Sequence, residues 1–205
     1  MGFARIVISC RDLKARVLAC QYWSQRHTLF EGYDDGVCLT DDAWFGVTPE
    51  PLARQIAYEV SGASSSKTTI VDLFAGDRDT LACAQNNAKI YELTDEITWV
   101  HGDSFEYLRL ALEEPEKLHE ALRIDPASTI LFGSPPWGGP GYRTDEVFNL
   151  HKMEPYNLRQ LHQAYKSFDH ALYLPRTSDL RASKALVAWI PAENSSHPTF
   201  YYGDD

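Results

Sequence analysis

The stretch Ser134-Pro135-Pro136-Trp137 has residue types that suit chemistry on a planar group. It comes just after the apolar run 129–132, which predicts a buried strand. The prolines fix φ and lack an N–H, so the loop is stiff and its carbonyls are free to accept hydrogen bonds. The indole ring offers a flat surface on which a base can stack. These features favour methyl transfer to a planar amino group, although a Pro/Gly-rich turn with one buried tryptophan is the structural alternative.

Length and charge limit the kinds of protein that this chain can be. Its 205 residues, 44% of them hydrophobic, can bury one core and most simply form one domain. The net charge of −10 argues against binding along a nucleic-acid backbone but allows recognition of one terminal nucleotide in a pocket. We expect an intracellular protein, neither secreted nor membrane-bound, because a run of about 18 apolar residues and a signal-peptide cleavage site are both missing.

The cysteines predict reduced thiols rather than disulfides or a metal site, because they are widely spaced and no histidine cluster lies near them. They are Cys10, Cys20, Cys38 and Cys83. We therefore expect no metal ion.

Helical and strand patterns alternate along the chain and predict a parallel-rich α/β sheet with helices on both faces. Helices are expected over 12–30, from Thr48-Pro49-Glu50 onward, and over 79–93, 105–121 (broken at Pro115) and 157–168. Strands are expected over 69–74, 97–100, 129–132, 170–174 and 185–190. Ligands of such sheets bind at the carboxyl ends of the strands, where the Ser134 loop begins.

An ordered set of short motifs, from about Gln21 to Asp179, resembles the trimethylguanosine synthases. The motifs are Tyr22-Trp23-Ser24-Gln25-Arg26, Leu29-Phe30, Asp34-Asp35-Gly36, residues 44–50, Val71 to Gly76, Asn86 to Tyr91, Gly102-Asp103, Ser134 to Pro140 and Leu174 to Asp179. Any one of these motifs is weak evidence, whereas the complete set in order is highly specific.

The resemblance implies a Rossmann-like methyltransferase that depends on S-adenosyl-L-methionine. A short N-terminal helical extension would occupy residues 1–43, and the methyltransferase domain would occupy 44–205. Members of this family methylate N2 of 7-methylguanosine caps at the 5′ ends of small nuclear and nucleolar RNAs. The resemblance therefore also implies a capped RNA partner and a location in the nucleus or nucleolus.

Roles for individual residues follow from the same resemblance. Ser134 and Pro135 would orient the amino group, Trp137 would stack on the positively charged 7-methylguanine, and Arg176 would contact the cap phosphates. The cofactor site would comprise Thr48, Pro49, Asp72, Phe74, Gly76, Asp103 and Ser134, with Asp103 bound to the adenine amine. Each role has a structural alternative: a core tryptophan for Trp137, a helix N-cap for Asp103 and a surface charge for Arg176.

Two parts of the family pattern are missing, so we expect a sheet that lacks part of the fold. Gly76 runs directly into Asp77, where the family continues with a glycine-rich loop, a helix, a strand and a ribose-binding carboxylate, about twenty residues in all. A second gap lies near Arg181. Gln21 also stands where a lysine commonly precedes the Tyr-Trp pair, which weakens the expected phosphate contact.

These gaps predict that the chain binds its cofactor poorly or not at all. Two alternatives to a cap methyltransferase stay open. One is a non-catalytic remnant with a cap-binding or protein-binding role. The other is a different amino-methyltransferase with a Pro-Pro-aromatic loop, acting on adenine N6 or a glutamine amide.

Overall fold

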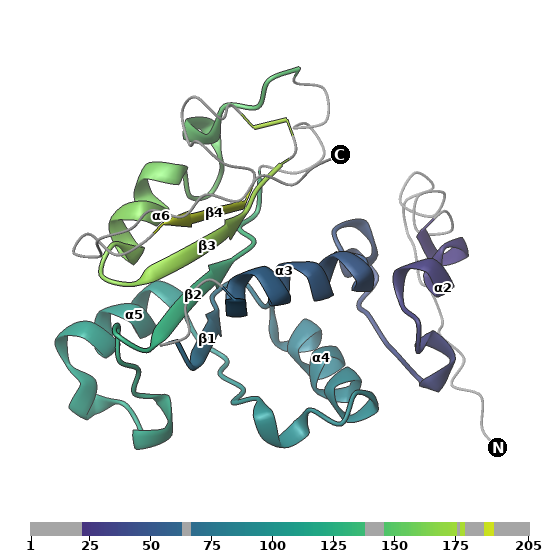
Figure 1. Ribbon diagram of the computed structural model, residues 1–205, viewed down its shortest axis with the longest axis horizontal. Helices are drawn as coiled ribbons and strands as arrows, with labels where there is room; N and C mark the ends of the chain where they lie inside the picture. Colours follow the sequence, from purple (N-terminus) through teal and green to yellow (C-terminus); the bar gives the residue numbers. More distant parts are fainter. Residues whose placement is uncertain (1–21, 63–66, 138–145, 176, 179–186, 191–205) are drawn as a thin grey trace. The chain divides into compact units, whose positions relative to one another are not determined.

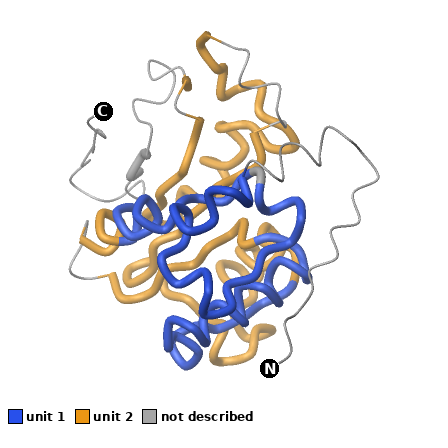
Figure 2. Tube along the Cα trace, turned by 90° about the vertical axis from the view of Figure 1, so that its right-hand side faces the viewer, with its two compact units in different colours: residues 1–57, 76–101 blue, residues 58–75, 102–205 orange. Residues whose placement is uncertain are grey.

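The computed structural model describes residues 22–62, 67–137, 146–175, 177–178 and 187–190. The chain divides into two compact units, drawn in different colours in Figure 2. Unit 1 comprises Met1–Ala57 and Gly76–His101, and unit 2 comprises Tyr58–Ala75 and Gly102–Asp205.

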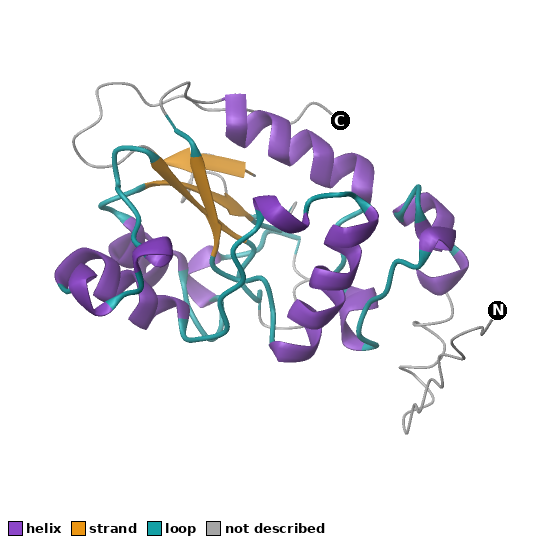
Figure 3. Cartoon of the chain, turned by 90° about the horizontal axis from the view of Figure 1, so that it is seen from below, coloured by secondary structure: helices purple, strands orange, loops and turns teal. Residues whose placement is uncertain are grey.

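A four-stranded sheet, drawn in orange in Figure 3, forms the centre of unit 2, and its strands lie side by side in chain order (Figure 1). The strands are β1 (Thr69–Asp72), β2 (Thr129–Gly133), β3 (Asp169–Tyr173) and β4 (Val187–Ile190). β1, β2 and β3 are parallel, and β4 is antiparallel to β3. The predicted parallel-rich sheet is confirmed, with strand ends that differ by a residue or two from the predicted ones. The carboxyl ends of the three parallel strands lie together at one end of the sheet, which we call its carboxyl edge.

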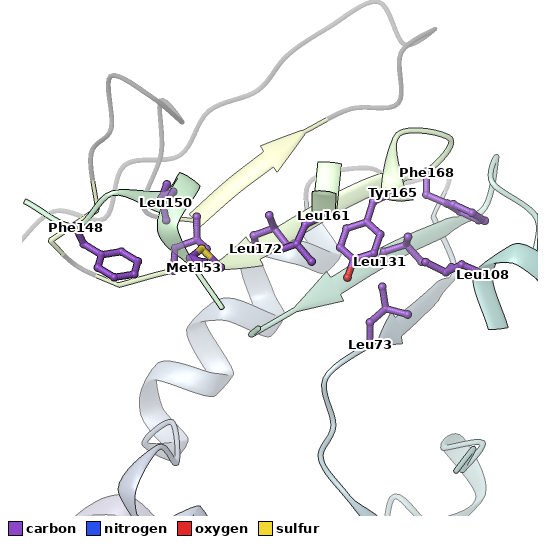
Figure 4. Close-up of a cluster of buried hydrophobic side chains, with 11 residues drawn as sticks. Leu73, Leu108, Leu131, Phe148, Leu150, Met153, Leu161, Tyr165, Phe168 and Leu172 are labelled. Atoms are coloured by element: carbon purple, nitrogen blue, oxygen red, sulfur yellow. The ribbon is translucent and has the colours of Figure 1, made fainter. Parts of the chain in front are cut away.

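Two helices of unit 2 pack against one shared core with the sheet. They are α5 (Ser104–Glu113) and α6 (Leu158–Tyr165). Leu131 of β2 and Leu172 of β3 are fully buried in this core. Figure 4 shows the buried cluster, which consists of Leu73, Leu108, Leu131, Phe148, Leu150, Met153, Leu161, Tyr165, Phe168, Leu172 and Leu174. The sheet residues Leu73, Leu131 and Leu172 thus meet α5 through Leu108 and α6 through Leu161.

Side-chain caps fix where these two helices begin. Asp103 accepts a hydrogen bond from the Glu106 N–H at 2.9 Å and starts α5. Asn157 and Gln160 form a reciprocal capping box at the start of α6. The predicted break at Pro115 is confirmed, because α5 ends at Glu113 and is followed by two 3₁₀ turns, η4 (Pro115–Lys117) and η5 (Glu120–Leu122).

The described part of unit 1 consists of helices and short helical turns. Its elements are α2 (Arg26–Leu29), η1 (Tyr33–Asp35), η2 (Asp42–Phe45), the first part of α3 (Glu50–Gly62), α4 (Arg78–Ile90) and η3 (Thr94–Glu96). Of the helix predicted over 12–30, residues 12–21 lie outside the described part. The helices predicted after Thr48 and over 79–93 are confirmed as α3 and α4.

The strand predicted over 97–100 is wrong, because these residues form no ladder. A strand needs a neighbour for its backbone hydrogen bonds. Ile97 and Val100 remain 38% and 44% exposed. Among the described residues of unit 2, β1 pairs with β2 alone, so it is an edge strand of the sheet, and its Ile70 is 50% exposed.

Across the described ranges, every helix is too short or too polar to cross a membrane.

Candidate functional site

The Ser134 loop lies at the carboxyl edge of the sheet, next to the end of β1. Asp72, the last residue of β1, is in register with Phe132 of β2, and Ser134 directly follows β2. Ser134 is exposed whereas Pro135 is buried. The buried proline anchors the loop and leaves the serine hydroxyl accessible, as chemistry at this position requires.

Trp137 is half-buried and packs against the hydrophobic core of unit 2. Its ring centroid lies 5.9 Å from that of Tyr173, at an interplanar angle of 47°. The indole is thus partly a core residue, as the structural alternative supposed, and partly accessible. Its predicted stacking role stays a prediction, and Arg176 lies outside the described residues.

The Asp72 carboxylate is an exposed group in a protein-rich neighbourhood. Desolvation by the surrounding atoms raises the pKa of this carboxyl, while the Phe74 N–H, which donates to Asp72 Oδ1 at 2.9 Å, opposes the rise. The residue is exposed to solvent, so its carboxylate is accessible to a ligand.

Phe74 and Asp103, both predicted to contact the cofactor, also have structural roles. Phe74 packs over Gly133, where an added Cβ would lie 3.4 Å from the phenyl ring. Asp103 is exposed and uses one carboxylate oxygen to cap α5. The second oxygen of Asp103 receives no hydrogen bond from the described residues, so a cofactor role stays a prediction.

Three predicted cofactor residues belong to unit 1. Thr48 and Pro49 are half-buried and lie just before α3. Gly76 has a φ of +100°, and a Cβ there would lie 2.6 Å from the Thr80 side chain. Glycine suits this turn, because the φ is one that residues with a Cβ rarely adopt and the added Cβ would collide with Thr80. Of the predicted site residues, the structure brings together Asp72, Phe74 and the Ser134 loop, all of which belong to unit 2.

Tyr165 was missed as a functional candidate by the sequence analysis. Only 1% of this residue is exposed, and its hydroxyl has no hydrogen-bond partner among the described residues. Burial raises the pKa of the phenol above its usual range, and the charges of Tyr156 and Asp72 add to the rise. A helical pattern with Leu158 and Leu161 places Tyr165 in the core, but no sequence signal shows that its hydroxyl is unpaired.

Among the described residues, no group of three or more His, Cys, Asp or Glu side chains could hold a metal ion.

The chain is similar to known proteins over most of its length. A model of the family "RNA cap guanine-N2 methyltransferase" matches residues 66–197. The trimethylguanosine synthase of Schizosaccharomyces pombe is 28% identical over 204 residues, which cover 87% of this chain and 78% of that protein. The trimethylguanosine synthase of Saccharomyces cerevisiae is 28% identical over 184 residues, which cover 78% of this chain and 55% of that protein.

Both alignments are longer than the part of this chain that they contain. In the first, 87% of 205 residues is about 178, so about 26 of the 204 aligned positions have no residue in this chain. In the second, 78% of 205 residues is about 160, so about 24 of 184 positions have none. The two yeast proteins thus carry similar numbers of residues that this chain lacks.

Proposed function

Because this chain belongs to the RNA cap guanine-N2 methyltransferase family, we propose that its Ser134 loop binds the guanine of a 7-methylguanosine RNA cap for methylation at N2. The observation that carries this proposal is the position of the loop. An accessible serine, a buried proline and a half-buried tryptophan lie at the carboxyl edge of a parallel sheet, next to the end of β1, where Asp72 is exposed.

In this proposal the residues of the loop align a weak nucleophile, because the lone pair of guanine N2 is conjugated with the ring. Ser134 Oγ and the Pro135 carbonyl accept hydrogen bonds from the N2 amino group. Trp137 stacks on the base, whose 7-methyl group leaves it positively charged and strengthens the contact. Alignment of this kind contributes on the order of several kcal/mol to the lowering of the barrier. Solvent reaches Ser134 and can take up the proton that N2 loses.

We propose S-adenosyl-L-methionine as the cofactor. When bound, it supplies the methyl group from a sulfonium and leaves as a neutral thioether. Asp72 fits its amino-acid end, because an exposed carboxylate can hold the ammonium group. We assign Thr48, Pro49, Phe74, Gly76 and Asp103 to the rest of this site.

A second candidate function is a remnant that binds caps or proteins without catalysis. Two observations favour it. α4 begins at Arg78, so the chain has no room for a crossover and a further strand after β1. The yeast relatives also carry about 24 to 26 aligned residues that this chain lacks. We place the missing residues after Gly76, with a smaller gap near Arg181.

The RNA partner and the location follow from the proposed activity. We propose capped small nuclear and nucleolar RNAs as substrates, contacted at the cap phosphates by Arg176, and residence in the nucleus or nucleolus. Fluorescence imaging of the tagged full chain tests the location, and an exclusively cytoplasmic signal would contradict it.

Calorimetric titration of the chain with S-adenosylhomocysteine, with and without 7-methyl-GTP, tests the proposal. The enzyme requires saturable binding that tightens with the cap analogue, and unmethylated GTP should compete poorly. No heat from the cofactor product but saturable binding of 7-methyl-GTP would favour the cap-binding remnant. Equal binding of GTP and 7-methyl-GTP would favour an amino-methyltransferase of another class.

Two tryptophan variants locate the cap site. Trp137→Ala should abolish 7-methyl-GTP binding, because it removes the stacking surface. Trp99→Ala is the matched control, since Trp99 is also half-buried but lies far from the loop in sequence, in unit 1. Equal losses in both variants would argue against Trp137 as the stacking residue.

A further inference from the structure

Two cysteines of unit 1 lie in contact, although they are 45 positions apart in sequence. The Cys38 thiol donates to the backbone carbonyl of Cys83, with Sγ 3.8 Å from the oxygen. Both residues are free thiols, and both are half-buried, so that a small molecule in solution can reach them. Contact and access together are what a reaction between two thiols requires.

The backbone of Cys38 is fixed over the turn of α4 that carries Cys83. The Asn87 side chain accepts from the Cys38 N–H and donates to the Cys38 carbonyl, each at 2.9 Å. Cys83 precedes Asn87 by four residues on α4, so the two side chains lie on one face of the helix, one turn apart. Asn86 donates to the Gly36 carbonyl at 3.0 Å and holds the chain two residues before Cys38. The two thiols are therefore kept near each other by the fold.

The Cys83 thiol holds its proton more firmly than an ordinary thiol. Burial, a hydrogen bond with the Cys38 thiol and the charge of that group raise the pKa of Cys83 from 9.0 to about 11, and the carboxylates of Asp79 and Asp77 add to the rise. A thiol must lose its proton before it acts as a nucleophile. Cys38 is therefore the residue that reacts first with an oxidant, and Cys83 is the neighbour that completes a bond.

We propose that Cys38 and Cys83 form a reversible disulfide bond when the chain meets a small-molecule disulfide such as oxidised glutathione. The Cys38 thiolate attacks one sulfur of the oxidant, which breaks its S–S bond, releases one glutathione and leaves the other on Cys38. Cys83 then loses its proton and attacks the Cys38 sulfur, which releases the second glutathione. Two protein thiols are oxidised, one small disulfide is reduced, and the two protons pass to the two glutathione thiolates.

The bond joins the two stretches of chain from which unit 1 is built. Cys38 belongs to Met1–Ala57, and Cys83 belongs to Gly76–His101. In the reduced chain these stretches are held by hydrogen bonds such as those of Asn87. A disulfide that closes a long loop restricts the unfolded chain and so stabilises the folded one. Oxidation thus tightens unit 1 and reduction releases it. Neither a cofactor nor a cap is needed, so the bond can be tested whatever the chain binds.

Peptide mapping of the full chain tests the proposal. The chain is incubated with oxidised glutathione, remaining thiols are blocked with N-ethylmaleimide, and tryptic peptides are analysed by mass spectrometry without reductant. Each cysteine falls in a separate tryptic peptide, with Cys38 in 27–54 and Cys83 in 79–89. We expect these two peptides to be linked in most of the oxidised chain and separate after dithiothreitol. Unmodified thiols, glutathione left on the two residues separately, or equal amounts of links to the other cysteines would overturn the proposal.

Two single-cysteine variants show which thiol reacts first. Cys83→Ser removes the second nucleophile, so glutathione should accumulate on Cys38. Cys38→Ser keeps only the more firmly protonated thiol of the pair, and Cys83 should take up glutathione about tenfold more slowly. Equal rates in the two variants would overturn the assigned order of the steps.

Asn87→Ala separates the reactivity of Cys38 from its nearness to Cys83. Without the amide, Cys38 is less confined, so it should take up glutathione faster but close the disulfide more slowly, and the mixed disulfide should accumulate. Asn86→Ala, which leaves both bonds to Cys38 in place, is the control and should close the disulfide nearly as fast as the unmodified chain. Equal rates of closure in all three proteins would show that α4 does not hold the pair together.

Thermal unfolding measures what the bond does to the protein. The oxidised chain should unfold about 5 °C or more above the reduced chain, because the loop that the bond closes is long. Cys83→Ser treated with the same oxidant should show no such rise. An equal or lower midpoint in the oxidised chain would overturn the stabilising role of the bond.

Discussion

The side-chain amide of Asn87 binds both backbone polar groups of Cys38, across 49 positions of sequence. Its Oδ1 accepts the Cys38 N–H at 2.9 Å, and its Nδ2 donates to the Cys38 carbonyl at 2.9 Å. Asn86 beside it donates to the Gly36 carbonyl at 3.0 Å. Two adjacent asparagines of α4 thus hold the segment that follows η1.

Asn87→Ala should release the Cys38 segment from α4. The part-buried N–H and carbonyl of Cys38 would lose their partners, at about 1–3 kcal/mol. We expect a lower urea midpoint and faster modification of Cys38 by a maleimide, measured by mass spectrometry. Asn86→Ala, which removes the exposed bond to the Gly36 carbonyl and a longer one of 3.4 Å to Asn87 Oδ1, is the control and should have a smaller effect. Equal labelling rates in both variants would contradict the role given to Asn87.

Glu50→Gln should destabilise unit 1, because one buried carboxylate joins three segments. Its oxygens accept hydrogen bonds from the Glu31 N–H at 2.9 Å, from the Tyr91 hydroxyl at 2.9 Å and from Arg54 at 2.6 Å and 3.0 Å. A neutral amide accepts these bonds less strongly and offers only one oxygen. We expect a loss of about 2 kcal/mol in the free energy of unfolding at pH 7.

The same carboxylate makes stability depend on acid pH. Burial raises the pKa of Glu50, but the bonds from Arg54, Glu31 and Tyr91 outweigh it and set the folded pKa below the ordinary 4.5. As pH falls below 4.5, the unfolded chain binds the proton first, so this stabilisation is present above pH 4.5 and lost below it. Glu50→Gln should therefore lose less stability than the unmodified chain between pH 5 and pH 3 (about these limits) in urea titrations. A parallel loss in both proteins would contradict this account.

His170 should weaken the protein in mildly acid solution. Burial lowers the pKa of its imidazole from 6.5 to about 4, although the Phe168 carbonyl, 3.0 Å from Nδ1, favours the protonated form. Between these values the unfolded chain binds a proton that the folded chain does not, so stability is full above pH 6.5 and falls toward pH 4. At about pH 5 the loss is about 2 kcal/mol.

His170→Leu should flatten this pH dependence, measured as the urea midpoint at pH 7 and pH 5 (about these values). The test is the change in the urea midpoint between the two pH values. The midpoint at a single pH is not, because the variant also loses the contact with the Phe168 carbonyl. The exposed His101 supplies the control variant His101→Ala, which should keep the slope. An unchanged slope in His170→Leu would assign the acid sensitivity to other groups.

Gly76→Ala should destabilise the turn between β1 and α4. The φ of +100° is unfavourable for alanine, and the new Cβ would lie 2.6 Å from Thr80 Cγ2. We expect a loss of about 2 kcal/mol or more in thermal or urea unfolding. Gly102→Ala is the control, because nothing lies within 4 Å of its Cβ position. Similar losses at the two positions would show that the turn is not strained.

Most helices and strands could be predicted from local patterns, because each of them buries apolar residues that recur at its own spacing. The helical spacing of Leu81 and Ala88 gave α4, and the apolar run before Ser134 gave β2. Residues 97–100 have side chains that favour a strand, but no other strand pairs with them, and a strand forms only by pairing with another. Tyr165 was missed for a related reason, since an unpaired hydroxyl depends on what surrounds it after folding.

The candidate site was predictable only in part. The Ser134 loop and Asp72 could be placed at one edge, because parallel strands bring their carboxyl ends together. Asp103 has a residue type that suits both a cap and a ligand contact, and its capping bond is the one that the structure contains. Nothing in the sequence indicated that Trp137 would share its surface between Tyr173 and solvent.

The edge position of β1 bears on how this fold tolerates loss. A strand removed from the middle of a sheet breaks two ladders and separates the parts on either side. A strand lost from the outer side of β1 breaks only its own ladder with β1, and β1, β2, β3 and β4 remain a continuous sheet. The buried core residues Leu131 and Leu172 lie on β2 and β3, each of which pairs with a strand on both sides. A shortened chain can therefore keep the buried centre of its sheet, provided that the loss lies beyond β1.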